Sequence, residues 1–222
     1  MIVAAVPVKD LVNAKQRLVP ALGAAERAAL AAAMLDDVLA ALTAAHLDRV
    51  WVVTREPAVD AAARARGAEP LAEDANRGHT AAVARAQAEA IRLGARVFLT
   101  IPGDVPCVTA EEIGRLADAA APGRPAFVPS RSGLGTNGVA LTPPGAMPLT
   151  FGEPSFEKHL ATARARGLEP RVLTLPGLGL DVDAPGDLAA LLAAPGATAS
   201  ARLVASWRAG GRVRPAGVPQ AS

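Results

Sequence analysis

Two carboxylates near the end of the chain are the residues best suited to chemistry. Asp181 and Asp183 are separated by the apolar Val182, and side chains two positions apart in an extended segment point to the same side. Converging carboxylates suit a hard divalent cation such as Mg²⁺, which commonly shares its coordination sphere with substrate phosphates. A solvated turn with an aspartate cap gives the same pattern. Asp104, in the Pro-Gly-Asp-Val-Pro turn at 102–106, adds a second acidic signal that favours the metal site.

A basic loop near the start of the chain complements these carboxylates. Lys9, Lys15 and Arg17 lie within nine residues, directly after an apolar run. Lysine and arginine neutralise phosphate oxygens, so we expect this loop to face the phosphates of a nucleotide triphosphate. A solvated basic loop is the alternative. Neither a P-loop nor a glycine-rich dinucleotide-binding pattern is present.

Three further loops carry groups that can bind an anion. Gly78 and His79 open a predicted helix, whose N-terminus can hold an anion or a base edge, although His79 can equally be an ordinary helix residue. The segments 130–138 and 151–159 offer backbone N–H groups and hydroxyls, unless they are plain turns. The first segment combines small residues and hydroxyls with the amide of Asn137, and the second places Gly152 and Ser155 before a predicted helix.

Alternating strands and helices must position these loops. Apolar runs predict buried strands at 2–8, 50–54 and 97–101, with further extended pieces near 71, at 126–129, at 139–141 and at 172–175. Helical spacing is found at 24–45, 57–66, 79–93, 155–166 and 187–193, and a capping box at Thr109 opens another helix. The alternation predicts an α/β fold with a mostly parallel sheet covered on both faces. Ligands of such sheets bind beyond the carboxyl ends of the strands, and Lys9, Asp104 and Asp181 each follow a predicted strand.

The composition excludes several classes of protein. A chain of 222 residues with 51% hydrophobic and 20% charged residues predicts one domain over 1–209, followed by a disordered Gly/Pro-rich tail at 210–222. The net charge is only +2, lysine and arginine are scattered outside the loop at 9–17, and aromatic residues do not interleave with them, so we expect no nucleic-acid partner. We expect no signal peptide and no membrane span, and therefore a cytoplasmic protein. Cys107 is the one cysteine; it rules out a disulfide framework and a cysteine-based zinc site, and we expect it to fill space rather than act as a nucleophile.

Several of these motifs occur together, and in the same order, in one family of enzymes. They are Pro7-Val8-Lys9 with 13–18, Arg77-Gly78-His79, the turn at 102–106, Gly135-Thr136-Asn137, Phe151-Gly152 with Ser155-Phe156 and His159, and the segment 181–188. Over roughly residues 1–193 the sequence resembles the CofC/FbiD family of guanylyltransferases in coenzyme F420 biosynthesis. The resemblance implies a three-layer, Rossmann-like α/β fold of the nucleotide-diphospho-sugar transferase type.

The resemblance also implies a reaction and a set of site residues. GMP would be transferred from GTP to the phosphate of a three-carbon acid, with release of pyrophosphate. Phosphoenolpyruvate is the first expectation for the acid, with 2-phospho-L-lactate and 3-phospho-D-glycerate as alternatives. The implied metal ligands, for Mg²⁺ or Mn²⁺, are Asp104, Asp181 and Asp183; the implied acid-binding residues are Thr136, Asn137, Gly152 and Ser155; and the implied nucleotide-binding residues are Pro7, Val8, Gly78, His79 and Gly103. The Asn137-Gly138 pair departs from many related sequences and leaves the choice of acid open. A homodimer and a hand-off of product to the next enzyme of the pathway are separate, open expectations for its partners.

The residues agree chemically with this assignment. Attack by a substrate phosphate on the α-phosphorus of GTP gathers negative charge in a small volume, so positioning and charge neutralisation carry most of the catalysis. Lys9, Lys15, Arg17 and Asp104 are therefore the candidate catalytic residues. No general base is needed, because the nucleophile is already ionised.

Three other functions share parts of the pattern. A cytidylyl- or molybdopterin-type nucleotidyltransferase would have a glycine-rich first loop, which 4–9 lacks. A glycosyltransferase would place its Asp-x-Asp pair after a strand in the middle of the chain. A regulator that only binds nucleotides would not need all three carboxylates.

Overall fold

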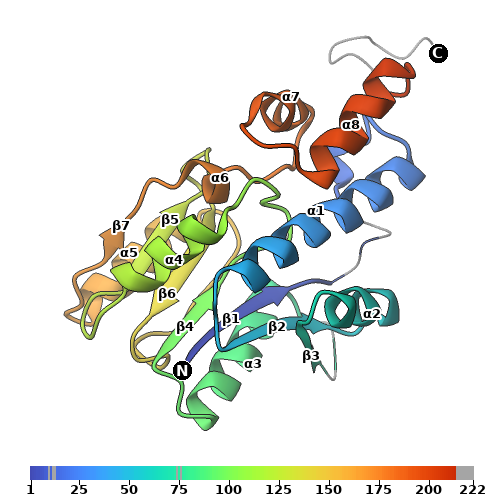
Figure 1. Ribbon diagram of the computed structural model, residues 1–222. Helices are drawn as coiled ribbons and strands as arrows, with labels where there is room; N and C mark the ends of the chain where they lie inside the picture. The colour runs from blue at the N-terminus through green and yellow to red at the C-terminus, as the bar shows by residue number, and fades with distance from the viewer. Residues whose placement is uncertain (10, 12–13, 74, 76, 214–222) are drawn as a thin grey trace.

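The computed structural model describes residues 1–9, 11, 14–73, 75 and 77–213. Its centre is a seven-stranded sheet in the order β3-β2-β1-β4-β6-β5-β7 (Figure 1). The strands are β1 (Ile2–Pro7), β2 (Arg49–Thr54), β3 (Glu69–Ala72), β4 (Val97–Thr100), β5 (Ala126–Pro129), β6 (Thr136–Leu141) and β7 (Arg171–Val172). The mostly parallel α/β sheet expected from the sequence is confirmed.

The direction of β6 decides which loops meet. Strands β1 to β4 run parallel, whereas β6 is antiparallel to both β4 and β5. Thr100, the last residue of β4, pairs with Val139 in β6. The beginning of β6 therefore lies at the same edge of the sheet as the ends of β1 and β4. Residues that precede or open β6 can reach the loops that follow those strands.

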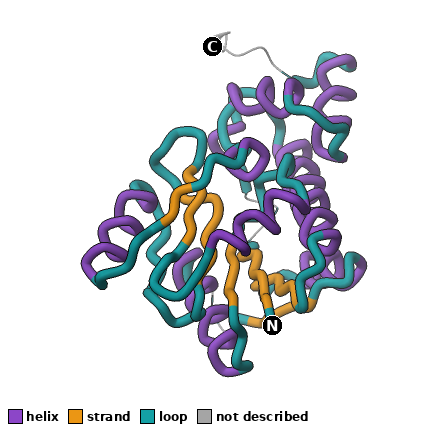
Figure 2. The backbone as a smooth tube through the Cα atoms, turned by 60° about the vertical axis from the view of Figure 1, so that its left-hand side comes forward, coloured by secondary structure: helices purple, strands orange, loops and turns teal. Residues whose placement is uncertain are grey.

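Helices cover both faces of the sheet, which gives three layers (Figure 2). They are η1 (Gln16–Leu18), α1 (Ala24–Ala44), α2 (Pro57–Ala65), α3 (His79–Arg92), α4 (Ala110–Ala119), α5 (Ser155–Ala165), α6 (Pro176–Gly179), α7 (Pro185–Ala193) and α8 (Ala199–Ala209). One apolar cluster joins α1, α2, α4 and α6 to the sheet, and a second joins α3 and α5 to its other face. Burial of these apolar faces is the main source of stability.

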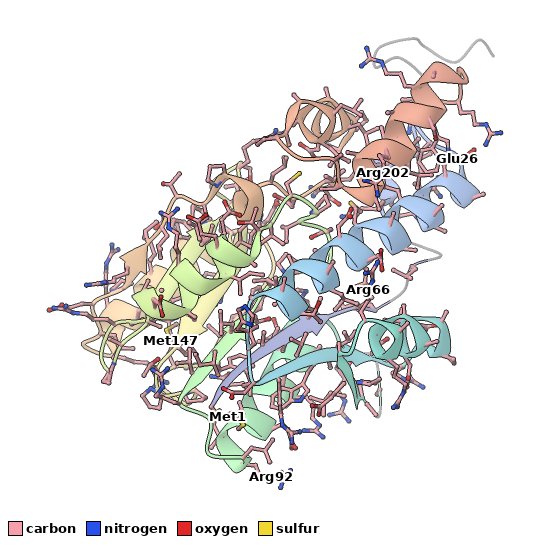
Figure 3. The ribbon with its side chains drawn as sticks, in the orientation of Figure 1. Met1, Glu26, Arg66, Arg92, Met147 and Arg202 are labelled. Atoms are coloured by element: carbon pink, nitrogen blue, oxygen red, sulfur yellow. The ribbon has the colours of Figure 1, made fainter. Side chains whose placement is uncertain are left out.

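A third apolar cluster ties the C-terminal part of the chain to the long helix α1. Val182 is fully buried there together with Leu30 and Met34 of α1 and Trp207 of α8. This packing holds the segment between α6 and α7 against the body of the domain. The charged side chains of Arg66 and Arg92 lie on the outer surface of the molecule (Figure 3).

The structure corrects three expectations drawn from the sequence. The strand expected at 139–141 begins at Thr136, because pairing with β4 and β5 outweighs the turn preference of Asn137 and Gly138. Asp181 does not directly follow a strand, since α6 lies between β7 and Asp181. The helix α8, within the expected domain, had no predicted counterpart. Residues 214–222 of the expected tail lie outside the described residues, and none of the described helices is long and apolar enough to cross a membrane.

Candidate active site

Two segments far apart in sequence meet at the carboxyl edge of the sheet. Asp104 lies in the turn after β4, and its carbonyl oxygen accepts a hydrogen bond from the backbone N–H of Val182 at 3.0 Å. Val182 is buried, whereas Asp181 and Asp183 on either side are partly exposed. The alternation expected for an Asp-x-Asp pair is therefore present, although 181–183 is not a strand.

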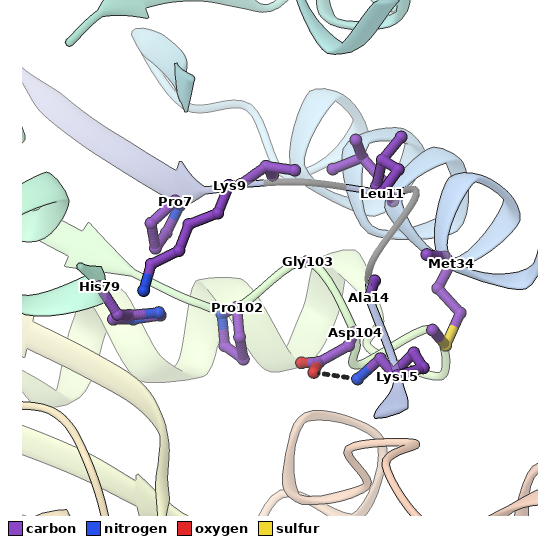
Figure 4. Close-up of a pocket in the computed structure, with 13 residues that line it drawn as sticks. Pro7, Lys9, Leu11, Ala14, Lys15, Met34, His79, Pro102, Gly103 and Asp104 are labelled. Carbon is purple, nitrogen blue, oxygen red and sulfur yellow. Dashed lines mark hydrogen bonds and ion pairs between the residues drawn. The ribbon is translucent and has the colours of Figure 1, made fainter. Parts of the chain in front are cut away.

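Lys15 joins carboxylates from both segments. Its Nζ lies 2.5 Å from Oδ2 of Asp104 (Figure 4) and 3.4 Å from Oδ1 of Asp183. The lysine side chain is only 7% exposed. Burial opposes its charge, but the two carboxylates outweigh burial and raise the pKa of Lys15 above its ordinary value. Lys15 also has a left-handed backbone with φ of 60°, which is uncommon for a residue other than glycine and costs energy that a functional position can retain.

Asp181 is held in place by Asn137 at the beginning of β6. The Asn137 side chain is buried, and its amide donates to Oδ1 of Asp181 at 3.0 Å and to the carbonyl oxygen of Gly179 at 3.2 Å. Burial raises the pKa of Asp181, the Asn137 amide lowers it, and the negative charge of Asp104 raises it further. A nearby cation would relieve both the burial cost and this repulsion.

The donor atoms suit a hard divalent cation. Within the described part of the chain, no three His, Cys, Asp or Glu side chains already form a set of metal ligands. The Lys15 ammonium instead supplies positive charge between Asp104 and Asp183. All three candidate side chains offer carboxylate oxygens, which Mg²⁺ and Mn²⁺ prefer. The residues therefore fit such a cation if the Lys15 ammonium moves aside.

Two cavities flank the carboxylates. The first, of about 140 Å³, is lined by the expected nucleotide-binding and catalytic residues Pro7, Val8, Lys9, Lys15, His79, Gly103 and Asp104. The second, of about 320 Å³, is lined among others by Arg17, Arg131, Glu153, Asp181, Asp183 and Asp187. The carboxylates of Asp104 and Asp183, joined by Lys15, thus belong to different cavities.

The first cavity includes the N-terminal end of α3. Lys9 extends toward His79 in Figure 4. Gly78, which precedes His79, has φ of 98°, and a Cβ atom there would lie 3.7 Å from Nζ of Lys9. Burial lowers the pKa of His79 to about 4, an effect that Asp104 opposes and Lys9 reinforces. His79 is therefore neutral near pH 7.

The expected acid-binding residues do not line the second cavity themselves, although their sequence neighbours Leu134 and Glu153 do. Thr136 and Ser155 are buried, and Oγ of Ser155 donates to Oγ1 of Thr136 at 3.1 Å. Gly152 is exposed and has φ of 105°, a conformation that favours glycine. Asn137 does not contact Thr136 or Ser155 through its side chain, because its amide donates to Asp181 and Gly179 instead.

Two residues that sequence reasoning left out support the Asp181–Asp183 segment. The Asp187 carboxylate accepts the backbone N–H groups of Asp183 and Ala184 at 3.0 and 2.7 Å and is paired with Arg131. Its position three residues after Ala184, in the first turn of a predicted helix, is a capping signal that could have identified it. Arg131 had no such signal, because only the fold brings 131 close to 187.

Comparisons with known proteins agree with the geometry. The family model described as "Guanylyl transferase CofC like" matches residues 2–208. A phosphoenolpyruvate guanylyltransferase of Rubrobacter xylanophilus is 40% identical over 87% of this chain and 94% of the relative. A 2-phospho-L-lactate guanylyltransferase of Methanothermobacter thermautotrophicus is 36% identical over 85% of this chain and 83% of the relative.

Solved structures support the fold. A protein of Desulfovibrio desulfuricans, described as a nucleotide-diphospho-sugar transferase, superposes with a TM-score of 0.76 at 16% identity and covers 94% of this chain and 95% of its own. A nucleotidyl transferase of Methanothermobacter thermautotrophicus gives a TM-score of 0.62 at 17% identity, over 86% of this chain and 95% of its own. At these identities the likeness shows the nucleotide-diphospho-sugar transferase-like fold alone. The family match and the relatives in sequence show more: this chain belongs to the CofC-like family of guanylyltransferases, which are nucleotidyltransferases.

Proposed function

We propose that this protein transfers GMP from GTP to the phosphate of phosphoenolpyruvate, releasing pyrophosphate, as a step of coenzyme F420 biosynthesis. The observation that carries the proposal is the Lys15 ammonium shared by Asp104, which lines the first cavity, and Asp183, which lines the second. Phosphoenolpyruvate is preferred over 2-phospho-L-lactate because relatives named for the former reach 42% identity, against 36% for the latter.

The first cavity is assigned to GTP and the second to the acid. Lys9 and Lys15 line the first cavity, where their ammonium groups can neutralise the β- and γ-phosphates that leave as pyrophosphate. Arg17 lines the second cavity and is 66% exposed beside Asp183, so its guanidinium can orient the acid's phosphate. The two substrates would then meet at the carboxylates.

The transfer is an in-line displacement at the α-phosphorus. A phosphate oxygen of the acid forms a bond to the α-phosphorus, and the bond from that phosphorus to the oxygen bridging to the β-phosphate breaks. The electron pair leaves with pyrophosphate, and no proton must be removed from the nucleophile. Asp104, Asp181 and Asp183 would hold a divalent cation, Mg²⁺ or Mn²⁺, which when bound supplies positive charge beside the reacting phosphates.

The direct test follows pyrophosphate release by the purified protein. Each of GTP, ATP, CTP and UTP is combined with phosphoenolpyruvate, 2-phospho-L-lactate or 3-phospho-D-glycerate, with Mg²⁺, with Mn²⁺ or with a chelator. We expect release that requires GTP, phosphoenolpyruvate and the metal together. Faster turnover with 2-phospho-L-lactate or 3-phospho-D-glycerate would show that this compound, and not phosphoenolpyruvate, is the acid substrate. Faster turnover with CTP would show that the base is cytosine and not guanine. Undiminished release of pyrophosphate in chelator would show that the reaction needs no divalent metal.

A further inference from the structure

His159 lies in a buried hydrogen-bond chain that fixes which ring nitrogen carries its proton. The residue is 1% exposed on α5, and its Nε2 lies 3.0 Å from the backbone nitrogen of Thr150. A backbone N–H can only donate, so Nε2 must accept and cannot carry a proton. The single proton of the neutral ring is therefore on Nδ1. Burial, together with the nearby His79, lowers the pKa of His159 to about 4, in agreement with a neutral ring.

The same tautomer determines the role of the Thr136 hydroxyl. Nδ1 of His159 lies 3.0 Å from Oγ1 of Thr136 and, carrying the proton, donates to it. Oγ of Ser155 donates to the same oxygen at 3.1 Å. A hydroxyl oxygen accepts through two lone pairs, and both are now used. The hydrogen of Thr136 must therefore point to another acceptor, and among the described residues the hydroxyl is paired only with His159 and Ser155.

The His159 ring has little freedom to change this arrangement. It stacks on Phe127, with ring centres 5.6 Å apart and planes inclined by 11°, and it meets the edge of Phe151 at 5.0 Å. Phe127 belongs to β5, and Phe151 directly precedes Gly152. Rotation of the ring would cost aromatic packing as well as two hydrogen bonds.

We propose that His159 is a positioning residue that fixes the Thr136 hydroxyl as a hydrogen-bond donor to an oxygen of the acid substrate. This inference rests on the proposed function and adds a residue and a direction of donation to the acid site. The Thr136 side chain points to the opposite face of β6 from Asn137, toward Ser155 at the beginning of α5. Leu134 and Glu153, which flank this pair in the sequence, line the acid cavity, and the carbonyl oxygen of Leu134 accepts the backbone N–H of Phe156, so the Thr136 hydroxyl lies close to that cavity. The anionic oxygens of a phosphorylated three-carbon acid accept hydrogen bonds but cannot donate them, which matches a hydroxyl restricted to donation.

A purely structural role for His159 would rest on its other nitrogen, which anchors the backbone at Thr150. Two substitutions separate the roles. In His159→Asn the side-chain amide nitrogen can replace Nδ1 and still donate to Thr136, whereas the bond from Thr150 is lost. In His159→Gln the longer side chain can place its oxygen where Nε2 lies and accept from Thr150, whereas the donor to Thr136 is lost.

The steady-state experiment measures KM for phosphoenolpyruvate and for GTP separately. We expect His159→Gln to raise KM for phosphoenolpyruvate about ten- to thirtyfold, the worth of a hydrogen bond to a charged group, with KM for GTP changed less than about twofold. His159→Asn should remain within about threefold of wild type for both. Thr136→Val should match His159→Gln, and the double variant should be no worse than Thr136→Val alone, since both act through one hydroxyl. The proposal would be overturned if His159→Gln kept the wild-type KM for phosphoenolpyruvate while His159→Asn raised it. It would also be overturned if His159→Gln raised KM for phosphoenolpyruvate and for GTP equally.

A measurement on the folded protein keeps the test independent of turnover. The chain has three histidines, so long-range nitrogen–proton NMR correlations of the ¹⁵N-labelled wild type can be assigned with His46→Asn and His79→Asn. We expect the Nδ1–H tautomer for His159 near pH 7; the Nε2–H tautomer or a protonated ring would overturn the inference. If the wild type shows the expected tautomer but transfers GMP to no three-carbon acid, the proposed function fails and the assignment of Thr136 to the acid fails with it. If it transfers GMP but the Gln and Asn variants behave alike, the inference alone fails.

Discussion

The ammonium of Lys15 lies 2.5 Å from Oδ2 of Asp104 while it also reaches Asp183, so one side chain from the N-terminal loop balances carboxylates from the middle and the end of the chain. An unpaired buried ammonium would be costly, and so would two facing carboxylates without a cation. Each group therefore depends on the others. A divalent cation at these carboxylates would free the ammonium to act on a phosphate.

The first prediction follows from this shared charge. Lys15→Met removes the ammonium but keeps the apolar stem, so Asp104 and Asp183 lose their counter-charge. Mg²⁺ should then raise the Tm of Lys15→Met more than that of wild type, because in wild type the ion competes with the lysine. Turnover should fall by one to several orders of magnitude, since the same ammonium is assigned to the phosphates.

Thermal unfolding at matched concentrations of Mg²⁺ measures this difference. Lys158→Met, at an exposed position on α5, serves as the control and should respond to Mg²⁺ as wild type does. If Mg²⁺ shifts the Tm of wild type and Lys15→Met equally, the ammonium and the metal do not share a site.

The second prediction concerns the two aspartates of the 181–183 segment. Asp181→Asn and Asp183→Asn should each lower kcat by about a hundredfold or more, because each removes a charged oxygen ligand without changing side-chain size. Their effects on stability should differ. Burial and the charge of Asp104 raise the pKa of Asp181, so removal of its charge should leave Tm unchanged or slightly higher. Asp183 accepts from Lys15 and Arg17, so its replacement should lower Tm.

Activity assays and thermal unfolding of the same preparations check both parts. The exposed Asp118 on α4 provides the control substitution Asp118→Asn, which should change neither quantity. Near wild-type kcat in both variants would refute the metal-site assignment.

The sequence predicted the apolar strands and the longer helices closely, because each carries its own periodicity. It did not predict α6, four residues with two glycines whose intrinsic helix propensity is low. The Glu112 carboxylate accepts the backbone N–H groups of Gly177 and Leu178 at 2.9 and 3.0 Å, while it also closes the capping box at Thr109. The capping box is visible in the sequence. The bonds from Glu112 to α6 join residues 65 positions apart in the chain, so they form only in the folded state.

The candidate site shows the same division between local and tertiary information. The types and spacing of Asp104, Asp181 and Asp183 indicated carboxylates that meet at one edge of the sheet. The pairing of Lys15 with Asp104 and Asp183 depends on the path of a loop that has no regular sequence pattern. The charge of Lys15 therefore predicts a position near phosphates, but it does not predict a position between two aspartates. The polar sequence around Asn137 predicts a loop residue that binds substrate, whereas the structure places Asn137 in β6 with its amide donating to Asp181. Their roles in metal and substrate binding stay predictions.

The third prediction tests the support that Glu112 gives to this segment. Glu112→Gln should lower the free energy of unfolding by about 1–3 kcal/mol, because an amide cannot accept hydrogen bonds through both of its heavy atoms and leaves a buried N–H unpaired. Its kcat should also fall, since α6 leads directly into Asp181. Glu111→Gln, at the exposed neighbouring position, should alter neither property in urea unfolding and turnover assays. Equal stability of the two variants would show that Glu112 does not hold α6.

The fourth prediction concerns pH. The pKa of His159 is lowered from 6.5 to about 4 by burial and by His79. As pH falls below about 6.5, the unfolded chain takes up a proton at this histidine but the folded protein does not until about pH 4. The free energy of unfolding must therefore decrease with falling pH across this window, by an amount on the order of 2–3 kcal/mol for a shift of this size, and be fully retained above it.

Urea unfolding at a series of pH values from about 7.5 to about 4.5 measures the slope. His159→Asn lacks the titrating ring, so its stability should depend less steeply on pH than that of wild type, whatever its absolute value. His46→Asn is the matched control, because His46 is exposed and has φ of 53°, a left-handed conformation that asparagine tolerates; its slope should equal that of wild type. If wild type and His159→Asn lose stability in parallel as pH falls, His159 is not held neutral by the fold. The hydrogen bonds assigned to its Nδ1 and Nε2 atoms would then have to be redrawn.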